Sequence, residues 1–275
     1  MKFKSVIIFF NILMLLFLGI MFVMPLIILG KGLALQFWHT GWYLAPLILA
    51  ALAVLDLYFA FNYRIYTLLE KEDWPALVQE LETKVLQKNH YSPRLVKLLI
   101  SSYLVLSDVK SVTELEKRLN ISKKSLINEN ALSFCAARIL HKDYEGAVDF
   151  LESRSSGDSK QKGRDAEWLR WYYGFALLLS RRFEESADIF LLLAREGREL
   201  ILIGLSAYFL SENLAAFLPL RVEDLRDAAK TGKERTRRSL YSRKDWEKEL
   251  KRLETEVFSA VLQVYTKKAE DYLYK

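Results

Sequence analysis

The sequence predicts an all-α protein whose chain begins with a two-helix transmembrane hairpin. The first 63 of the 275 residues hold only four charged side chains, and the remaining 212 carry the other 70. From residue 64 onward, apolar residues recur at spacings of three and four, proline is rare, and alternating β-branched runs do not occur. The first pattern is typical of a membrane segment, and the second of amphipathic helices in a folded region.

The composition excludes several classes of protein and site. Apolar residues make up 52% of the chain and include 16 Phe, 14 Tyr and 6 Trp, which excludes intrinsic disorder. Cys135 is the single cysteine, so a disulfide framework is excluded, and we expect its thiol to lie in the core. The three histidines fall in separate segments, and no catalytic or phosphate-binding motif occurs. We therefore expect no metal site, no cofactor and no enzymatic activity.

Two apolar runs, residues 6–29 and 42–61, form the expected hairpin. The first run is about 36 Å long as a helix, enough to cross a hydrocarbon core of roughly 30 Å. A secretory signal peptide is the alternative, but the run is longer than a signal h-region and no small-residue cleavage site follows it. We expect a retained span, with residues 30–41 as a short connecting loop.

The basic residues that flank the two spans predict the orientation of the hairpin. Lys2 and Lys4 precede the first span, Arg64 and Lys71 follow the second, and Lys31 alone lies between them. Lys and Arg residues that flank a transmembrane helix stay on the cytoplasmic side of the membrane. The pattern predicts a protein integral to a bacterial cytoplasmic membrane, with both termini and the folded region in the cytoplasm.

Each expected span contains one polar residue, Asn11 in the first and Asp56 in the second. In an antiparallel hairpin both lie about 9–10 Å from the same end of the spans, so their side chains could form a hydrogen bond. An acid within a membrane is a candidate functional residue, for example in an ion path. We expect a structural pair or a contact with another membrane subunit, and a small transport subunit that uses Asp56 is the alternative.

Four stretches after the hairpin share a pattern of a polar turn, an aromatic or apolar residue, and a small or apolar residue three positions later. The aromatic or apolar positions are Trp74, Val109, Tyr144 and Phe183, at intervals of 35, 35 and 39 residues. Asp73 is the expected N-cap of the first stretch. Apolar helices are expected before the other three, over residues 94–107, 129–141 and 167–180. The helix before Trp74 would have to be the end of the second span.

This repeat, over residues 64–220, resembles the tetratricopeptide repeat, in which two antiparallel helices recur about every 34 residues. The residues that carry the resemblance are aromatic or small ones at preferred positions: Tyr144, Ala147, Gly174, Phe183, Ser186 and Phe190. Other positions depart from the family pattern: Leu77, Val112, Cys135 and Arg138. The resemblance implies an α-solenoid whose concave surface binds peptides or helices of partner proteins. A generic helical bundle is the alternative fold.

If the repeat register holds, two inner helices offer candidate residues for binding a partner protein. The later helix presents four aromatic residues partly toward the concave surface: Trp168, Trp171, Tyr172 and Phe175. The earlier helix offers Arg94, Lys97 and Ser101. Aromatic residues are favoured anchors of interfaces, but the same side chains could instead fill the core between repeats. The expected function is a membrane-tethered scaffold; a structural subunit of an envelope complex, with the solenoid on the outer side, is the alternative.

Residues 221–275 combine a basic segment with an expected capping helix. Residues 230–244 carry seven basic side chains against Glu234, a net charge of +6. This segment could contact anionic lipid head groups or be a solvated loop, and no nucleic-acid-binding fold accompanies it. Before it, helices over residues 199–210 and 213–218 are expected to continue the stack. After it, one long helix within residues 233–272 is expected to cap the solenoid.

Overall fold

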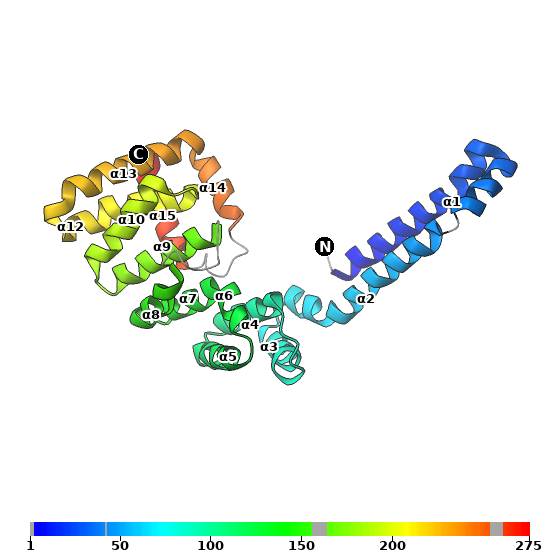
Figure 1. Ribbon diagram of the computed structural model, residues 1–275, viewed down its shortest axis with the longest axis horizontal. Coiled ribbons are helices and arrows are strands. Elements are labelled where there is room, and N and C mark those ends of the chain that lie inside the picture. The colour runs from blue at the N-terminus through cyan, green and yellow to red at the C-terminus, as the bar shows by residue number, and fades with distance from the viewer. Residues whose placement is uncertain (1–2, 42, 156–163, 254–260) are drawn as a thin grey trace. The chain divides into compact units, whose positions relative to one another are not determined.

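All regular secondary structure is helical in the computed structural model, which describes residues 3–41, 43–155, 164–253 and 261–275 (Figure 1). No strand occurs in these ranges, so the all-α prediction is confirmed. The chain divides into two compact units, Met1–Asn89 and His90–Lys275.

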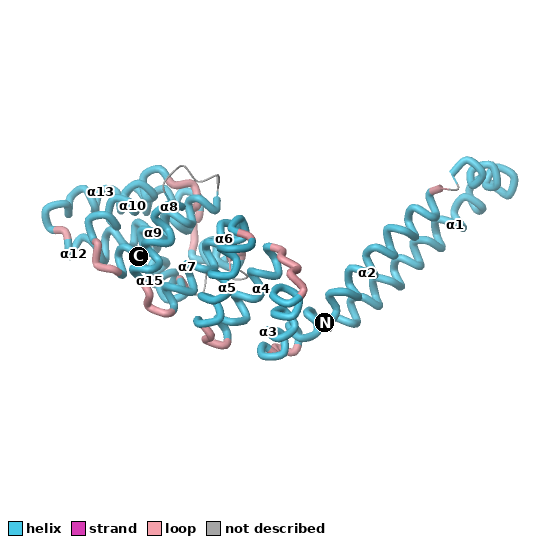
Figure 2. The backbone as a smooth tube through the Cα atoms, turned by 60° about the horizontal axis from the view of Figure 1, so that its bottom comes forward, coloured by secondary structure: helices cyan, strands magenta, loops and turns pink. Residues whose placement is uncertain are grey.

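The first unit contains α1 (Phe3–Gly41), α2 (Leu44–Glu70), α3 (Trp74–Glu82) and the π-helical turn η1 (Thr83–Gln87). Helices α1 and α2 lie side by side and run antiparallel (Figures 1 and 2). The prediction of a loop at residues 30–41 is wrong, because α1 bends at Gly30 and continues to Gly41. Gly30 has φ 72°, which glycine adopts without steric cost, and the following Leu and Ala residues favour a helix.

Helix α2 runs without interruption from Leu44 to Glu70. The expectation that the second apolar helix leads directly into the first helix–turn–helix is therefore confirmed, and residue 63, the expected domain boundary, falls inside α2. Asp73 caps α3 as predicted, since its carboxylate accepts a hydrogen bond from the backbone N–H of Ala76 at 3.2 Å. Residue 42, the expected start of the second span, lies outside the described residues.

The second unit is a succession of antiparallel helices that pack on one another in chain order (Figure 2). Its helices up to the middle of the unit are α4 (Pro93–Val105), α5 (Val109–Ser122), α6 (Lys124–Glu129), α7 (Ala131–Leu140), α8 (Tyr144–Ser155), α9 (Arg164–Leu179) and α10 (Phe183–Glu196). Pairs α4/α5, α7/α8 and α9/α10 pack together, and α4, α7, α9 and α11 (Leu200–Phe209) pack in sequence. Residues 156–163, which fall in the longer interval of 39 residues between Tyr144 and Phe183, lie outside the described residues.

Four turns between paired helices share one backbone geometry. Each contains a non-glycine residue with positive φ: Glu72 (54°), Ser107 (58°), Lys142 (64°) and Arg181 (62°). Each residue also donates to the carbonyl three positions earlier, and the next residue donates to the carbonyl five positions earlier. This is the Schellman arrangement, which ends a helix. Helices α3, α5, α8 and α10 then start at Trp74, Val109, Tyr144 and Phe183, so the four predicted helix starts are confirmed.

Small residues sit where paired helices approach most closely, as the sequence suggested. A Cβ atom on Gly174 of α9 would lie 2.8 Å from Cγ2 of Ile189 on α10. Ser186 of α10 donates a buried hydrogen bond of 2.8 Å to the Gly174 carbonyl. The glycine is therefore required by the short distance between helices, since its own φ is not positive.

Two expectations for the end of the chain are wrong. Helix α11 continues through the π-helical turn η2 (Leu210–Leu214) into α12 (Ala215–Phe217), so residues 199–210 and 213–218 do not form an antiparallel pair. In place of one long capping helix, the chain forms η3 (Pro219–Arg221), α13 (Val222–Ser239), α14 (Arg243–Lys251) and α15 (Gln263–Tyr274). Ser242 and Asp245 form a capping box that starts α14, and this helix ends at Lys251, well before residue 272. Residues 254–260 lie outside the described residues.

The part of the cap that the structure describes encloses α11. Helices α13, α14 and α15 all pack against α11, and so do α9 and α10. Gly204 of α11 lies against the cap, since a Cβ atom there would be 2.9 Å from the Trp246 ring. Every residue from Ile201 to Leu210 is buried. The C-terminal helices thus cover the end of the helical stack, although not as one continuous helix.

Candidate functional site

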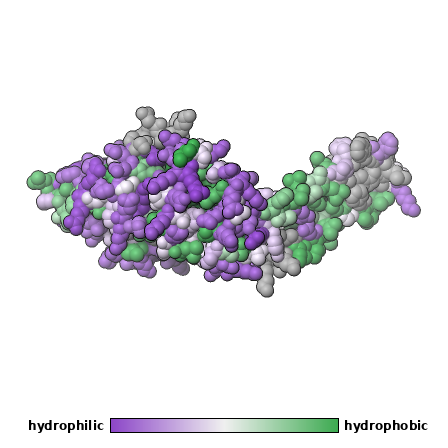
Figure 3. Space-filling model, turned by 90° about the horizontal axis from the view of Figure 1, so that it is seen from below, coloured by the Kyte–Doolittle hydropathy of each residue, from purple (hydrophilic) through white to green (hydrophobic). Residues whose placement is uncertain are grey.

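Among the residues that the structure describes, three helical stretches are long and apolar enough to cross a membrane: Ile8–Ile28, Pro46–Glu70 and Leu200–Phe217. The first two make up most of α1 and α2 and are almost entirely uncovered by other parts of the chain. The outward residues of these helices are large and apolar, among them Leu15, Ile27 and Phe61. Figure 3 shows this hydrophobic surface in green. The third stretch differs, because more than half of it is buried inside the second unit.

The polar residues Asn11 and Asp56 of the two expected spans lie together. Asn11 Nδ2 donates a hydrogen bond to Asp56 Oδ1 at 3.2 Å. Asn11 is half-buried between the helices, while Asp56 lies at the exposed edge of their contact. The expected contact is therefore present, and it joins the helices over a sequence separation of 45 residues.

We expect Asp56→Leu to loosen the packing of α1 on α2. The substitution removes the acceptor and leaves the Asn11 amide without this bond in apolar surroundings, so opening of the pair should increase about 3- to 30-fold, as for a polar contact worth about 0.6–2 kcal/mol. Amide hydrogen exchange of α1 and α2 in detergent micelles measures the change. Asp56→Asn keeps an acceptor oxygen and is the control. Equal exchange in the wild type and Asp56→Leu would show that the bond does not stabilise the pair.

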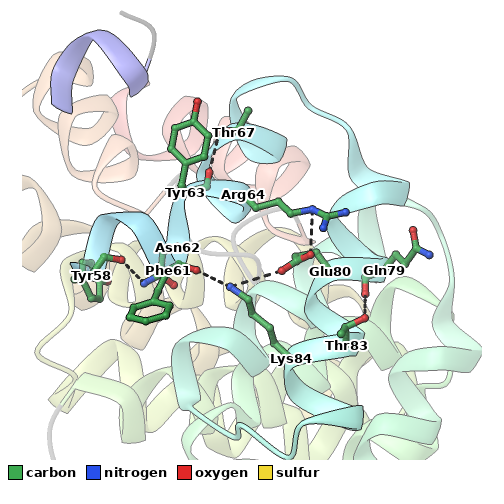
Figure 4. A network of polar contacts seen from close by, with 10 residues as sticks. All are labelled: Tyr58, Phe61, Asn62, Tyr63, Arg64, Thr67, Gln79, Glu80, Thr83 and Lys84. Carbon is green, nitrogen blue, oxygen red and sulfur yellow. Dashed lines mark hydrogen bonds and ion pairs between the residues drawn. The ribbon is translucent and has the colours of Figure 1, made fainter. Parts of the chain in front are cut away.

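A polar network fixes α3 and η1 to the end of α2 within the first unit (Figure 4). Arg64 Nε of α2 lies 3.1 Å from Glu80 Oε2 of α3. Lys84 Nζ of η1 donates to the Phe61 carbonyl of α2 at 2.9 Å and lies 3.7 Å from Glu80 Oε1. Beneath the network lies an apolar core formed by Ile65, Leu77, Leu81 and Val85. Because charged contacts and a buried core both hold it, α3 is a fixed extension of α2.

The four aromatic candidates of α9 are in the core of the second unit, not on a concave surface. At most 1% of the surface of any of them is exposed: Trp168, Trp171, Tyr172 and Phe175. The Trp171 ring centroid lies 5.2 Å from that of Phe175, 5.8 Å from Phe190 and 5.9 Å from Phe209. The prediction that these residues face a groove is therefore wrong. Helices α7, α8, α10 and α11 surround α9 and cover the face that the sequence suggested was open.

The other three candidates lie on α4 and are separate from the aromatic cluster. Arg94 is exposed, and Lys97 and Ser101 are half-buried on the same face of the helix. Ser101 Oγ donates to the Lys97 carbonyl at 2.8 Å. Helix α4 packs on α5, α6 and α7, whereas the aromatic residues belong to α9. The structure thus leaves these polar residues at the surface but does not bring them together with the aromatic set.

The basic segment, residues 230–244, is the second half of α13, a short turn and the start of α14. Three of its cations have roles inside the fold. Arg235 donates to the carbonyls of Ala194 at 3.0 Å, Arg195 at 2.7 Å and Gly197 at 2.6 Å, at the end of α10. Arg243 pairs with Asp271 at 2.8 Å and with the buried Glu270 at 3.3 Å.

Lys233 is the third cation with an internal role. Its Nζ donates to the Tyr272 carbonyl at 2.6 Å and lies 4.6 Å from the centre of the Tyr272 ring. Burial, together with the nearby charge of Arg237, lowers the pKa of the Lys233 ammonium. The remaining basic residues of the segment are exposed: Lys230, Arg237, Arg238 and Lys244.

Sequence reasoning missed two residues that order the second unit. The Glu167 carboxylate of α9 accepts hydrogen bonds from the backbone N–H groups of Arg198, at 3.0 Å, and Glu199, at 2.9 Å, where α11 begins. Arg235, in contrast, places a positive charge at the C-terminal end of α10. Both contacts place a charge at the helix end that favours it. No local pattern could have revealed them, because each joins residues more than 30 positions apart in the chain.

The chemistry of Cys135 agrees with its expected place in the core. The side chain is fully buried in α7, and this burial raises the pKa of the thiol well above its ordinary value. A thiol held in the neutral form is a poor nucleophile. Within the described ranges, no group of three or more His, Cys, Asp or Glu side chains is arranged to hold a metal ion.

Comparison with known proteins places the chain in a family. Residues 111–275, from α5 to the C-terminus, match the family described as "Uncharacterised Treponema protein". A protein of Treponema pallidum (strain Nichols), described as "Uncharacterized protein", is 30% identical over 222 residues, which cover 78% of this chain and 67% of that protein. No solved structure matches the chain. The chain therefore belongs to this family of uncharacterised Treponema proteins.

Proposed function

We propose that the protein is a membrane-anchored scaffold that docks a partner protein beside the bilayer. Helices α1 and α2 cross the membrane as a hairpin, and the paired helices that follow form a tetratricopeptide-like solenoid. The observation that carries the proposal lies in the first unit. An uncovered apolar helix, α2, continues without a linker into a helix–turn–helix that polar contacts fix in place.

The dimensions of α1 and α2 support the membrane hairpin. Ile8–Ile28 and Pro46–Glu70 are 21 and 25 residues long. At 1.5 Å per residue each exceeds the roughly 30 Å of a hydrocarbon core. Water would have to cover almost all of this apolar surface in a soluble protein, at a cost of roughly 25 cal/mol per Å². Leu200–Phe217 is also long and apolar enough to cross a membrane. Because α9, α10, α13 and α15 enclose it, we assign it to the core of the second unit.

The recurring turn supports the tetratricopeptide-like solenoid. Each of the four residues with positive φ lies two positions before the first residue of the second helix in its pair. Each turn also has the same pair of backbone hydrogen bonds. Asp73, Asp108 and Asp143 act as N-caps in three of the turns. Solenoids of this kind expose long surfaces built from successive repeats, and such surfaces bind protein segments.

The docking surface that we propose includes Arg94, Lys97 and Ser101 of α4, without the buried aromatic residues of α9. Exposed Lys230, Arg237, Arg238 and Lys244 remain available for weak contact with anionic lipids, at about 1 kcal/mol per charge near a membrane surface. The protein has no catalytic role in this proposal.

Affinity purification from native membranes tests the docking surface. Charge reversal of the α4 face, Arg94→Glu with Lys97→Glu, should reduce recovery of the bound partner about tenfold, as expected for the loss of about 1.4 kcal/mol at an interface. Lys110→Glu with Lys117→Glu, at exposed positions of α5, is the matched control. Circular dichroism should show equal helicity in both variants. Equal partner recovery by both variants would contradict the proposed surface.

Reporter fusions after Lys275 test the orientation. A reporter that is active only in the cytoplasm should be active, and one that requires export should be inactive, because basic residues flank both spans on the same side. The opposite result would place the helical region outside and favour the alternative of an envelope-complex subunit.

A further inference from the structure

The second unit carries a rigid apolar knob where α12 leads through η3 into α13. Three side chains form it: Phe217, Pro219 and Leu220. Leu220 is fully exposed and Phe217 is 57% exposed. Figure 3 shows green surface on the side of the second unit where α12 lies in Figure 1. Single exposed apolar residues are common, but three neighbours at one protruding turn mark a contact site.

The knob is held in position by contacts to α10. Phe217 stacks on Phe183 of α10, with ring centroids 4.3 Å apart and planes 5° apart. Arg221, directly after the knob, donates to Glu184 at 2.8 Å and to Asp188 at 2.7 Å, and these hydrogen bonds raise the pKa of its guanidinium. An apolar anchor that is already ordered loses little conformational entropy when it binds.

Acidic side chains surround the knob. Glu184 and Asp188 remain largely exposed although both contact Arg221, so the cluster of three has one negative charge in excess. Glu223, in the first turn of α13, adds one more exposed carboxylate, while the neighbouring Asp224 pairs with Arg195. The knob thus presents apolar side chains within a negative rim, and it fits an apolar surface with a positive rim.

The opposite end of α13 has the complementary chemistry. Tyr241, just after the helix, is 79% exposed. Arg237 and Arg238 in the last turn and Lys244 at the start of α14 are exposed beside it in sequence. This basic end, defined by Tyr241 and these three cations, presents one aromatic ring within a positive rim.

The two surfaces cannot meet within one chain. Helix α13 has 18 residues, and at 1.5 Å per residue it separates its ends by about 27 Å. The helix is buried along Leu225, Ala228, Ala229, Gly232 and Thr236 against α10 and α11, so it cannot fold back on itself. Complementary charge and apolar contact are therefore available only between two molecules.

We propose that two copies of this chain associate head to tail, with the knob of one copy on the basic end of the other. This is a heterologous contact, because different surfaces of the two copies meet. The contact leaves one knob and one basic end free in each dimer, so further copies can add to it. Opposite charges steer the contact and fix its direction.

Disulfide trapping between two variants tests the direction of the contact. Full-length Leu220→Cys and Tyr241→Cys proteins, each with a different affinity tag, are mixed in detergent micelles and oxidised with copper phenanthroline in air. The mixture should give a disulfide-linked dimer that carries both tags, at least about tenfold above either variant alone. Raising the ionic strength from about 0.05 M to about 0.5 M should reduce this product, because salt screens exposed charges. Native Cys135 is fully buried and does not compete.

Ile121→Cys mixed with Tyr241→Cys is the matched control, since Ile121 is 90% exposed but lies on α5. Cross-linking no stronger than in this control would overturn the proposal, and so would a dominant dimer between two Leu220→Cys chains. An environment-sensitive dye on the Leu220→Cys variant distinguishes a lipid occupant. A blue shift on adding vesicles of neutral phospholipid, with no cross-linked dimer, would assign the knob to the bilayer and contradict the contact between copies.

Discussion

Trp171→Ala should lower the free energy of unfolding by about 3–5 kcal/mol, the range for truncation of a large buried aromatic side chain. The indole is completely buried between α9, α10 and α11, in contact with Phe175, Phe190 and Phe209. Its Nε1 has no hydrogen-bond partner among the described residues, so the effect arises from lost packing and from the cavity left behind. Urea unfolding of the full chain in detergent micelles, followed by circular dichroism, measures the difference.

Ile121→Ala is the control, because this side chain is almost fully exposed and its truncation should change the stability by less than about 0.5 kcal/mol. The comparison also decides between two roles of Trp171. A loss below about 1 kcal/mol together with loss of a bound partner would indicate a surface anchor rather than a core residue.

Arg235→Ala should be the most destabilising substitution among the basic residues of α13, at about 2–3 kcal/mol. The guanidinium binds three carbonyls at the end of α10, where the negative end of the helix dipole strengthens hydrogen bonds from a cation. Removing the guanidinium leaves carbonyl oxygens at the end of α10 without their donor. The resulting loss of stability exceeds the net contribution of an ordinary hydrogen bond. The same urea titration detects the change.

Two variants make the Arg235 prediction specific. Arg235→Lys keeps the charge but lacks the planar fork that reaches Ala194 and Gly197 together, so we expect an intermediate loss. Arg238→Ala removes a neighbouring cation that is mostly exposed and 4.0 Å from Glu234, and it should change the stability by less than about 0.5 kcal/mol. Equal effects of Arg235→Ala and Arg238→Ala would show that the contacts to α10 do not stabilise the fold.

The sequence predicted the starts of helices well where a turn is followed directly by the N-cap residue of the next helix. Asp73, with Trp74 and Pro75 after it, marks the start of α3, and Asp108 and Asp143 mark the starts of α5 and α8 in the same way. The contact between Asn11 and Asp56 also followed from the sequence, because two polar residues at equal depth in an antiparallel pair have few other partners.

Predictions failed where the environment of a residue depends on helices distant in sequence. Apolar residues recur at spacings of three and four from Trp246 onward, which suggested one long helix, but α14 ends at Lys251 and α15 begins at Gln263. The aromatic residues of α9 have an amphipathic spacing that is compatible with a groove. Only the positions of α7, α8, α10 and α11 show that the face of α9 with these aromatic residues is covered.

The sequence by itself determined the helical class, the apolar pair near the N-terminus and the places where paired helices begin, since hydrophobic spacing and capping act over a few neighbouring residues. The tertiary structure alone decided that Trp171 is core, that Arg235 and Glu167 bind helix ends, and that α13 separates the apolar knob from the basic end. Those roles depend on side chains that meet across tens of residues, and the folded arrangement of the helices, not the local order of amino acids, brings them together.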